Sequence, residues 1–152
     1  MRVALGSDHA GFELKGLLSR ELISLGHEVQ DLGTYSTEPC DYPDFCFPVA
    51  ERVARGEADR GVVLGGSGIG ESIAANKVPG VRAAVVTSEE TARLSRMHND
   101  ANVLALGERT NPDPEQVVRW LRIWLTTPFE GGRHIPRLRK IAAYEQAHCS
   151  LR

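Results

Sequence analysis

Several signals that would place a protein in a special class are absent from this chain of 152 residues. No apolar run approaches the roughly 18 residues that a membrane-spanning helix needs. The 18 basic residues are outnumbered by 20 acidic ones, and a net charge of −2 is not the basic excess that nucleic-acid-binding proteins carry. We therefore expect that neither a membrane nor a nucleic acid is a partner of this protein.

Cysteine is scarce as well, with three residues at Cys40, Cys46 and Cys149. Their number is odd, they contain no CxxC pair, and the spacing of the first two matches no common zinc-binding framework. We expect free thiols, and the sequence indicates no role for Cys149. The chain reaches Asp8 and Glu13 before a signal-like apolar stretch develops, which favours the cytoplasm as its location.

The composition that is present is that of an ordinary globular protein, with 41% hydrophobic and 25% charged residues. The length suits one domain, which we place over residues 1–152. Five short apolar runs are nearly continuous in hydrophobicity, a pattern that predicts strands buried on both faces of a parallel sheet. The runs are Arg2–Gly6, Glu28–Leu32, Gly61–Gly65, Val81–Val86 and Asn102–Leu106.

Segments with helical periodicity lie between these runs and after the last of them. The alternation of strand and helix predicts an α/β fold with a doubly wound sheet and right-handed crossovers. Trp120 and Trp124 give one predicted helix a wide apolar face, which either packs into the core or is exchanged across a dimer interface. The predicted helices are Ala10–Leu25, Pro43–Arg55, Gly70–Val78, Ser88–His98, Pro112–Thr127 and Pro136–His148.

A glycine-rich loop over residues 65–71 follows the third apolar run, at the carboxyl end where such sheets bind ligands. Its backbone N–H groups can hold a phosphate or a developing oxyanion. Ser67 and Glu71 are four residues apart and can face one opening, where a carboxylate could move a carbon-bound proton. Alternatively, Glu71 is only a first-turn carboxylate that the helix dipole favours.

Dinucleotide binding fits this loop poorly. Its glycines read G-x-G-x-G rather than G-x-G-x-x-G, and they follow the third strand rather than the first. The carboxylate of Glu71 would also repel a pyrophosphate.

Other polar residues follow the first and fifth runs, among them Asp8, His9 and Arg109, and we expect these groups to converge with the glycine loop on one rim. We place His98 at the same rim. No helical His-x3-His spacing supports a metal site.

A basic segment near the end of the chain carries Arg133 and Arg137, four residues apart. One helical turn would present both guanidinium groups on one face, where they could clamp a phosphate. The alternative is an ordinary solvated helix face.

Six motifs in this order carry a family resemblance that extends from Arg2 to about Ala147. They are Gly6-Ser7-Asp8-His9-Ala10-Gly11-Phe12, Asp41-Tyr42-Pro43-Asp44, Gly65-Gly66-Ser67-Gly68-Ile69-Gly70, Ile73-Ala74-Ala75-Asn76-Lys77, His98-Asn99-Asp100-Ala101-Asn102-Val103-Leu104 and Gly131-Gly132-Arg133-His134. The chain resembles the type B ribose-5-phosphate isomerases, a family that also includes the subunits of galactose-6-phosphate isomerase.

The resemblance implies a Rossmann-like three-layer αβα sandwich with a five-stranded parallel sheet. It implies a homodimer or a dimer of dimers with active sites shared between subunits. The implied reaction interconverts ribose 5-phosphate and ribulose 5-phosphate through a cis-enediolate, without a metal or an organic cofactor.

The resemblance also implies roles for individual residues. Glu71 is the base that moves a proton between C2 and C1, Ser67 assists proton movement between the two oxygens, and His98 with Asp8 opens the sugar ring. The oxyanion hole is formed by loop amides at Gly66, Gly68, Ile69 and Gly70. The sugar hydroxyls are contacted by Tyr42 and Asn99, and the phosphate by His9, Arg109 and, from the partner subunit, Arg133 and Arg137.

One departure from the family is Gly65, because many members carry a cysteine there as the base. This chain therefore resembles the branch in which a glutamate at position 71 takes over. Three alternatives remain open. The substrate could be galactose 6-phosphate, allose 6-phosphate or a tetrulose phosphate, and the assembly could be a dimer or a tetramer. A protein of a different functional class, a non-catalytic sensor of a sugar phosphate or a nucleotide, is the third alternative.

Overall fold

The computed structural model describes residues 1–110 and 113–149. Five parallel strands form one sheet in the order β2-β1-β3-β5-β4, which confirms the predicted α/β fold. The strands are β1 (Arg2–Ser7), β2 (Glu28–Asp31), β3 (Arg60–Gly65), β4 (Ala83–Val85) and β5 (Val103–Gly107). The helices are α1 (Phe12–Ser24), α2 (Pro43–Ala54), α3 (Ile69–Ala75), α4 (Glu89–Asn99), α5 (Pro114–Thr126) and α6 (Ile135–Cys149), with a 3-10 turn at Gly132–His134 before α6.

The three central strands correspond to three of the predicted apolar runs. Nearly all residues of β1, β3 and β5 are buried, and Val62 pairs with Leu5 on one side and Leu104 on the other. The two edge strands β2 and β4 contain no buried residue. The prediction of burial on both faces is therefore wrong for these two strands, because each has a neighbouring strand on one side only.

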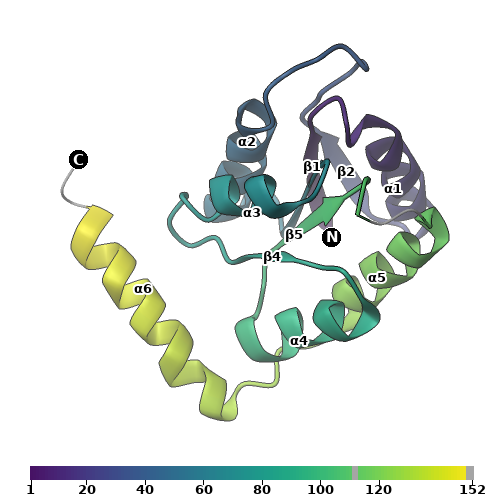
Figure 1. Ribbon diagram of the computed structural model, residues 1–152. Coiled ribbons are helices and arrows are strands. Elements are labelled where there is room, and N and C mark those ends of the chain that lie inside the picture. The colour runs from purple at the N-terminus through teal and green to yellow at the C-terminus, as the bar shows by residue number, and fades with distance from the viewer. Residues whose placement is uncertain (111–112, 150–152) are drawn as a thin grey trace.

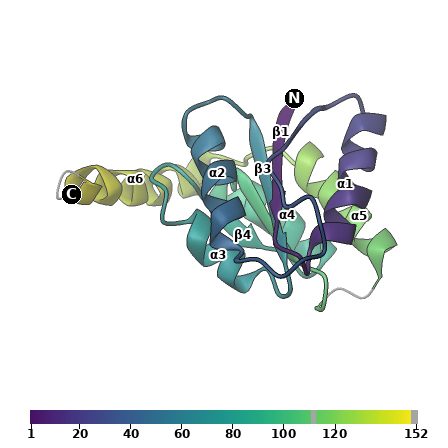
Figure 2. The ribbon, with the colours of Figure 1, turned by 90° about the horizontal axis from the view of Figure 1, so that it is seen from above.

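Helices cover both faces of the sheet (Figure 2). One face carries α1, α4 and α5, and its core contains large side chains such as Leu18, Leu104 and Trp124. The other face carries α2 and α3, and its core is built from small residues such as Ala50 and Ala105. Trp124 is fully buried and Trp120 is 7% exposed, so the helix with two tryptophans packs into the core rather than across an interface.

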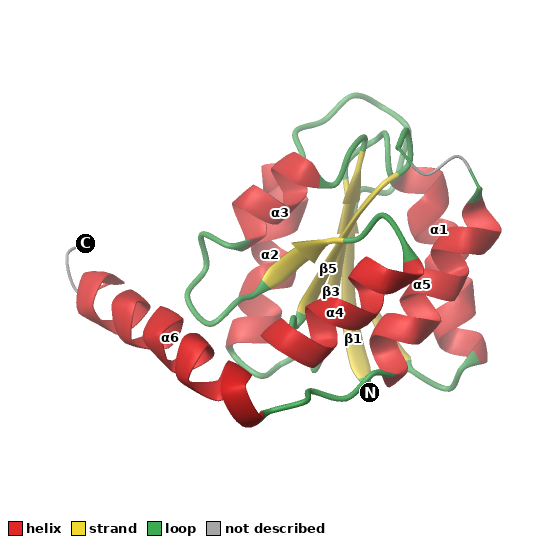
Figure 3. Cartoon of the chain, turned by 60° about the horizontal axis from the view of Figure 1, so that its bottom comes forward, coloured by secondary structure: helices red, strands yellow, loops and turns green. Residues whose placement is uncertain are grey.

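Helix α6 leaves these layers and projects away from the rest of the chain (Figures 1 and 3). None of its 15 described residues is buried. Its apolar side chains include Ile141, 47% exposed, and Tyr144, 66% exposed. One contact with the sandwich is a hydrogen bond of 2.9 Å from the backbone N–H of Gly80 to Glu145. The helix therefore presents an apolar surface that the chain itself leaves uncovered.

Most predicted boundaries are shifted in the structure by one to three residues, as at the amino end of α5 and the carboxyl end of α3. The helix predicted to begin at Pro112 begins at Pro114, and positions 111 and 112 lie outside the described residues, as do residues 150–152 of the predicted domain. The helix predicted to reach Val78 ends at Ala75, because the side-chain amide of Asn76 bonds to the backbone N–H and carbonyl of Ala83. Within residues 1–110 and 113–149, no helix combines the length and apolarity that crossing a membrane requires.

Candidate active site

The carboxyl ends of β1, β3 and β5 meet at a cleft of about 420 Å³. It lies where the strand order reverses, the position at which open parallel sheets bind ligands. This confirms that the polar residues following the first, third and fifth runs converge. The cleft is lined by Asp8, Tyr42, Gly66, Ser67, Gly70, Glu71, Arg109 and Thr110.

The glycine loop is fixed in place by the neighbouring strand. The backbone N–H groups of Glu108 and Arg109 donate to the carbonyls of Gly65 and Gly66 at 2.9 and 3.0 Å. Gly68 has a left-handed φ of 78°, and a Cβ there would lie 3.0 Å from the backbone of Leu106. A glycine is therefore required at this turn, which carries the chain from β3 into α3.

Glu71 lies in the first turn of α3 and is only 3% exposed. Its Oε2 has no hydrogen-bond partner among the described residues. Desolvation raises the pKa of this carboxyl, and the nearby charge of Asp8 raises it further, while hydrogen bonds from its own backbone N–H and that of Gly68 oppose the shift. A buried carboxylate with one oxygen left without a partner, beside a cleft, is suited to take up a proton and differs from an ordinary solvated first-turn glutamate.

The Glu71 carboxylate occupies the volume that a side chain at residue 65 would fill. A Cβ built on Gly65 would overlap Oε1 and Cδ of Glu71. Because residue 65 has no side chain, the carboxylate can turn back over the end of β3.

Asp8 is 8% exposed and begins the turn into α1. Its Oδ1 accepts hydrogen bonds from the backbone N–H groups of Ala10 and Gly11, at 2.9 and 3.1 Å. These bonds hold the carboxylate at the wall of the cleft and leave Oδ2 outside both of them. Two carboxylates, Asp8 and Glu71, therefore lie in one cleft and influence each other electrostatically.

Two further glycines of the loop make room for side chains that line the cleft. A Cβ at Gly70 would lie 2.9 Å from the Tyr42 hydroxyl oxygen, and a Cβ at Gly66 would lie 3.2 Å from Nη1 of Arg109. The phenol and the guanidinium therefore rest directly on the glycine loop. They supply a hydroxyl and a positive charge to a cleft that otherwise carries two carboxylates.

His9 lies beside this arrangement rather than in the lining of the cleft. Its Nδ1 is 3.2 Å from both the backbone nitrogen and the carbonyl oxygen of Cys40. This contact ties the end of β1 to the segment that leads into Tyr42.

His98 is the main correction to the predicted site. It lies in the last turn of α4, just before Val103, which pairs with Gly61 and Ala83 at the amino ends of their strands. A helix that connects two parallel strands returns the chain to the amino end of the sheet, so His98 and Asn99 lie at the opposite end from Asp8. The prediction that His98 shares a rim with His9 is wrong within one chain.

His98 instead belongs to a second group of polar residues. Its Nε2 is 3.7 Å from a carboxylate oxygen of Glu130, and Nε2 of His134 is 3.6 Å from the same oxygen. The two imidazole rings stack with their centroids 4.3 Å apart. Arg137 lies beside them, with Nη1 at 3.4 Å from Nδ1 of His134. The positive charge of Arg133 also lowers the pKa of His134. Both arginines that were predicted to clamp a phosphate therefore lie in this group.

Glu130 was not among the predicted site residues, and His134 was predicted only as part of the basic segment that could clamp a phosphate. The sequence signal that could have identified them is the pair Gly131-Gly132, with φ of 70° and 54°. Two left-handed glycines in succession turn the chain back, so that the residues flanking them meet.

The ligating atoms of His98, Glu130 and His134 lie within 4.8 Å of one another, as metal ligands would. An imidazole binds a metal through a lone pair in the plane of its ring. Because the two rings are stacked with only 16° between their planes, an ion in the plane of one ring would lie well outside the plane of the other. This arrangement does not fit a metal ion, whereas a carboxylate oxygen that faces Nε2 of both rings can hold their protons.

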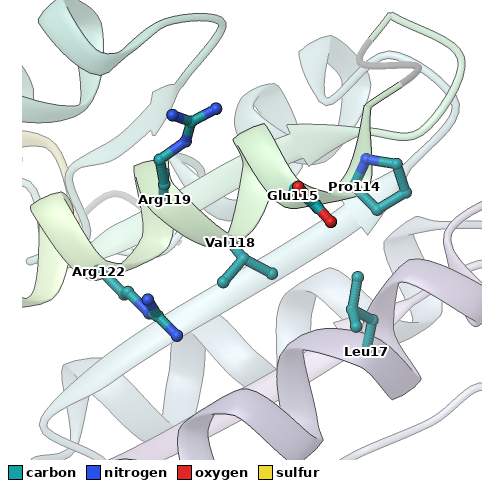
Figure 4. A pocket seen from close by; sticks show the side chains of 6 residues that line it. All are labelled: Leu17, Pro114, Glu115, Val118, Arg119 and Arg122. Carbon is teal, nitrogen blue, oxygen red and sulfur yellow. The ribbon is translucent and has the colours of Figure 1, made fainter.

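A larger hollow of about 510 Å³ lies between α1 and α5, away from the glycine loop (Figure 4). It is an open trough on the outside of the helices, and its Arg122 is paired with Glu21 at 2.6 Å. Its lining residues are Leu17, Pro114, Glu115, Val118, Arg119 and Arg122. It brings no nucleophile and no buried acid or base together.

The cysteines are free thiols, as predicted. Cys46 is fully buried behind the cleft. Burial raises the pKa of this thiol, and the charges of Glu71 and Asp8 raise it further, so it remains protonated. Glu71 is therefore the better candidate for a base.

The chain matches the family model described as Ribose/Galactose Isomerase over residues 3–141. A ribose-5-phosphate isomerase B from Escherichia coli (strain K12) is 46% identical over 145 residues, which cover 95% of this chain and 97% of the relative. A solved structure of Clostridium thermocellum ribose-5-phosphate isomerase B is 50% identical, with a TM-score of 0.95 over 97% of this chain and 99% of that one. A Mycoplasma genitalium ribose-5-phosphate isomerase B with bound ribulose-5-phosphate is 42% identical, with a TM-score of 0.91 over 95% and 96% of the two chains.

Proposed function

The chain belongs to the ribose/galactose isomerase family, and we propose that it interconverts ribose 5-phosphate and ribulose 5-phosphate with Glu71 as the base. The observation that carries the assignment of the base is the buried carboxylate of Glu71 at the wall of the cleft, whose Oε2 has no partner among the described residues. Desolvation raises its pKa toward the range in which a carboxyl both accepts and returns a proton.

In the forward direction, Glu71 removes the proton from C2 of the open-chain aldose. The electron pair of the C2–H bond forms the C1–C2 double bond, and the carbonyl electrons move to O1, giving a cis-enediolate. The backbone amides of Gly66, Gly68, Ile69 and Gly70 stabilise the negative charge on oxygen. Ser67 assists the transfer of a proton from O2 to O1, and Glu71 then returns its proton to C1, which leaves the ketose.

Ribose 5-phosphate must first open from its furanose form. An acid donates a proton to O4 while a base takes the proton of the O1 hydroxyl, the C1–O4 bond breaks, and the C1–O1 double bond forms. Asp8 is the base at the cleft, and His98 is the acid. Because His98 lies at the far end of its own sheet, the acid must come from a second copy of the chain.

The remaining predicted contacts divide in the same way. Tyr42, Arg109 and the neighbouring His9 belong to the cleft of one subunit, where they contact the sugar and its phosphate. Asn99, Arg133 and Arg137 belong to the other end of the chain and reach the sugar and phosphate of a neighbour. The uncovered apolar face of α6 supports a homodimer or a dimer of dimers as the active form.

The role of Glu71 is tested by following the exchange of the C2 proton of the substrate with deuterated solvent. Glu71→Gln keeps the shape of the side chain but cannot accept the proton, so the exchange rate should fall by about 100-fold or more. Glu115→Gln, which changes a first-turn glutamate of α5, is the matched control. Exchange at the wild-type rate in Glu71→Gln would remove Glu71 from the role of base.

The shared site is tested by mixing two inactive variants, Glu71→Gln and His98→Asn. In a mixed dimer, one of the two sites combines an intact Glu71 with an intact His98, so about a quarter of all sites should recover after random subunit exchange. A mixture that stays as inactive as the separate variants would show that each chain works alone. Initial rates on ribose 5-phosphate, galactose 6-phosphate, allose 6-phosphate and a tetrulose phosphate identify the preferred substrate.

A further inference from the structure

Glu130 is held next to His98 by the backbone. Its N–H donates to the carbonyl of Met97 at 3.0 Å, and Nε of Arg96 donates to the carbonyl of Thr127 at 3.4 Å. The connection from α5 to α6 is thus attached to the last turns of α4 at two points. The position of the Glu130 carboxylate relative to His98 is therefore set by the fold rather than by chance side-chain contact.

The carboxylate of Glu130 faces the same nitrogen on both stacked rings, with Oε2 at 3.7 Å from Nε2 of His98 and 3.6 Å from Nε2 of His134. These are distances of charge pairs, and catalytic hydrogen bonds often tighten from such lengths when the substrate complex forms.

Only one placement of the proton on the neutral ring of His134 suits the groups that face its two nitrogens. Nη1 of Arg137 can only donate, so Nδ1 of His134 accepts, and the proton of the neutral ring sits on Nε2, directed toward Glu130. His134 is 4% exposed, and its Nε2 has no other partner among the described residues. Desolvation and the charges of His98, Arg133 and Arg137 lower the pKa of His134 against the opposing charge of Glu130, which favours the neutral ring. His134 therefore orients the carboxylate and supports the ring of His98 by stacking.

We propose that Glu130 is a positioning residue that keeps a proton on Nε2 of His98, so that Nδ1 of His98 is the atom that exchanges a proton with the sugar. This inference rests on the proposed function, in which His98 opens the furanose. When Nδ1 gives its proton to O4, the ring becomes the neutral Nε2–H tautomer, and Glu130 stabilises the imidazolium that precedes it. A carboxylate that fixes the tautomer of a catalytic histidine in this way acts as the aspartate does in a serine protease.

The experiment uses the fact that only one of the two substrates is cyclic. Ribulose 5-phosphate cannot close to a furanose because its O5 carries the phosphate, so exchange of its C1 proton with deuterated solvent needs Glu71 but no ring opening. For Glu130→Gln we expect the turnover of ribose 5-phosphate to fall about ten-fold, since ring-opening acids contribute about 100-fold or more in all. The exchange at C1 of ribulose 5-phosphate should stay within about two-fold of the wild type, because it bypasses the step that Glu130 supports.

Controls separate this role from a structural one. Glu130 is a surface residue, 49% exposed, and Glu90→Gln changes an exposed glutamate at the other end of α4. Glu130→Asp keeps the charge and should recover part of the turnover. Nitrogen-15 NMR of the imidazoles reads the tautomer directly, and we expect His98 to lose its preference for Nε2–H in Glu130→Gln.

Three results would overturn the proposal. They are an unchanged turnover of ribose 5-phosphate in Glu130→Gln, an equal loss of turnover and of ribulose 5-phosphate exchange, and an unchanged tautomer of His98. Failure of the proposed function is distinguishable from these, because the wild type itself would then show neither turnover nor exchange.

Discussion

The carboxylate of Glu71 fills the space that a side chain on Gly65 would need. The two residues are neighbours in the fold although residue 71 comes six positions after residue 65, and a side chain at 65 would overlap the carboxylate. The family resemblance places a cysteine at position 65 in many relatives. In this chain, the glycine at 65 is what allows the carboxylate of Glu71 to take this position.

Substitution of Gly65 should therefore inactivate the enzyme even though Glu71 remains. In Gly65→Ala the new Cβ collides with the carboxylate and forces it away from the substrate carbon, so we expect kcat to fall about 100-fold. Gly16→Ala, in α1 and away from the cleft, is the control. A stricter comparison is Gly65→Cys combined with Glu71→Ala, which should exchange the substrate proton faster than Glu71→Ala alone.

The buried carboxylate of Glu71 should also lower the free energy of unfolding at neutral pH. Burial raises its pKa in the folded protein, so between the ordinary pKa of a glutamate and this raised value the folded state binds more protons than the unfolded chain. The free energy of unfolding consequently falls as the pH rises through that window. We expect Glu71→Gln to have a higher Tm than the wild type at neutral pH, and this advantage to vanish below the ordinary pKa. Equal melting curves at all pH values would contradict the assigned burial.

The same shift affects the pH dependence of catalysis. The base must be ionised to act, and desolvation raises the pKa of Glu71, so kcat/KM should fall on the acid side at a pH above the ordinary titration of a glutamate. Initial rates measured from acid to neutral pH test this expectation. An acid limb at the ordinary glutamate position would indicate that the carboxylate is solvated in the active enzyme.

Arg137 should contribute to phosphate affinity more than to the chemical step. A lost charged contact is worth about 1.5–3 kcal/mol, so Arg137→Ala should raise KM for ribose 5-phosphate by about ten-fold or more while kcat changes little. Arg139→Ala, an exposed arginine two positions further along α6, is the matched control. An unchanged KM in Arg137→Ala would remove this residue from the phosphate site.

The exposed face of α6 should be required for assembly. Ile141→Glu places a charge on an apolar side chain that is 47% exposed in the single chain, and we expect it to weaken dimer formation by about 100-fold. Activity should be lost together with the dimer, although the sandwich keeps its fold. Light scattering and circular dichroism measure the two properties separately, with Lys140→Glu as the control. A dimer that survives Ile141→Glu would place the interface elsewhere.

The sequence alone determined the layers of the fold and one half of the site. Continuous apolar runs and helical periodicity are local patterns, so they identified the strands and all the helices to within a few residues. The glycine loop, Asp8 and Arg109 were found together because each follows a strand of a parallel sheet, and such ends necessarily share a rim.

Only the tertiary structure decided which candidates belong together. His98 precedes a strand in the sequence, and the return of α4 carries it to the amino end of the sheet, away from Asp8. Glu130 and His134 meet it there because two left-handed glycines reverse the chain, and the carboxylate of Glu71 is buried because Gly65 leaves room for it. Packing of distant segments and the direction of a returning helix are not encoded in local patterns, which is why the sequence placed His98 at the rim of Asp8 and the structure places the two residues at opposite ends of the sheet.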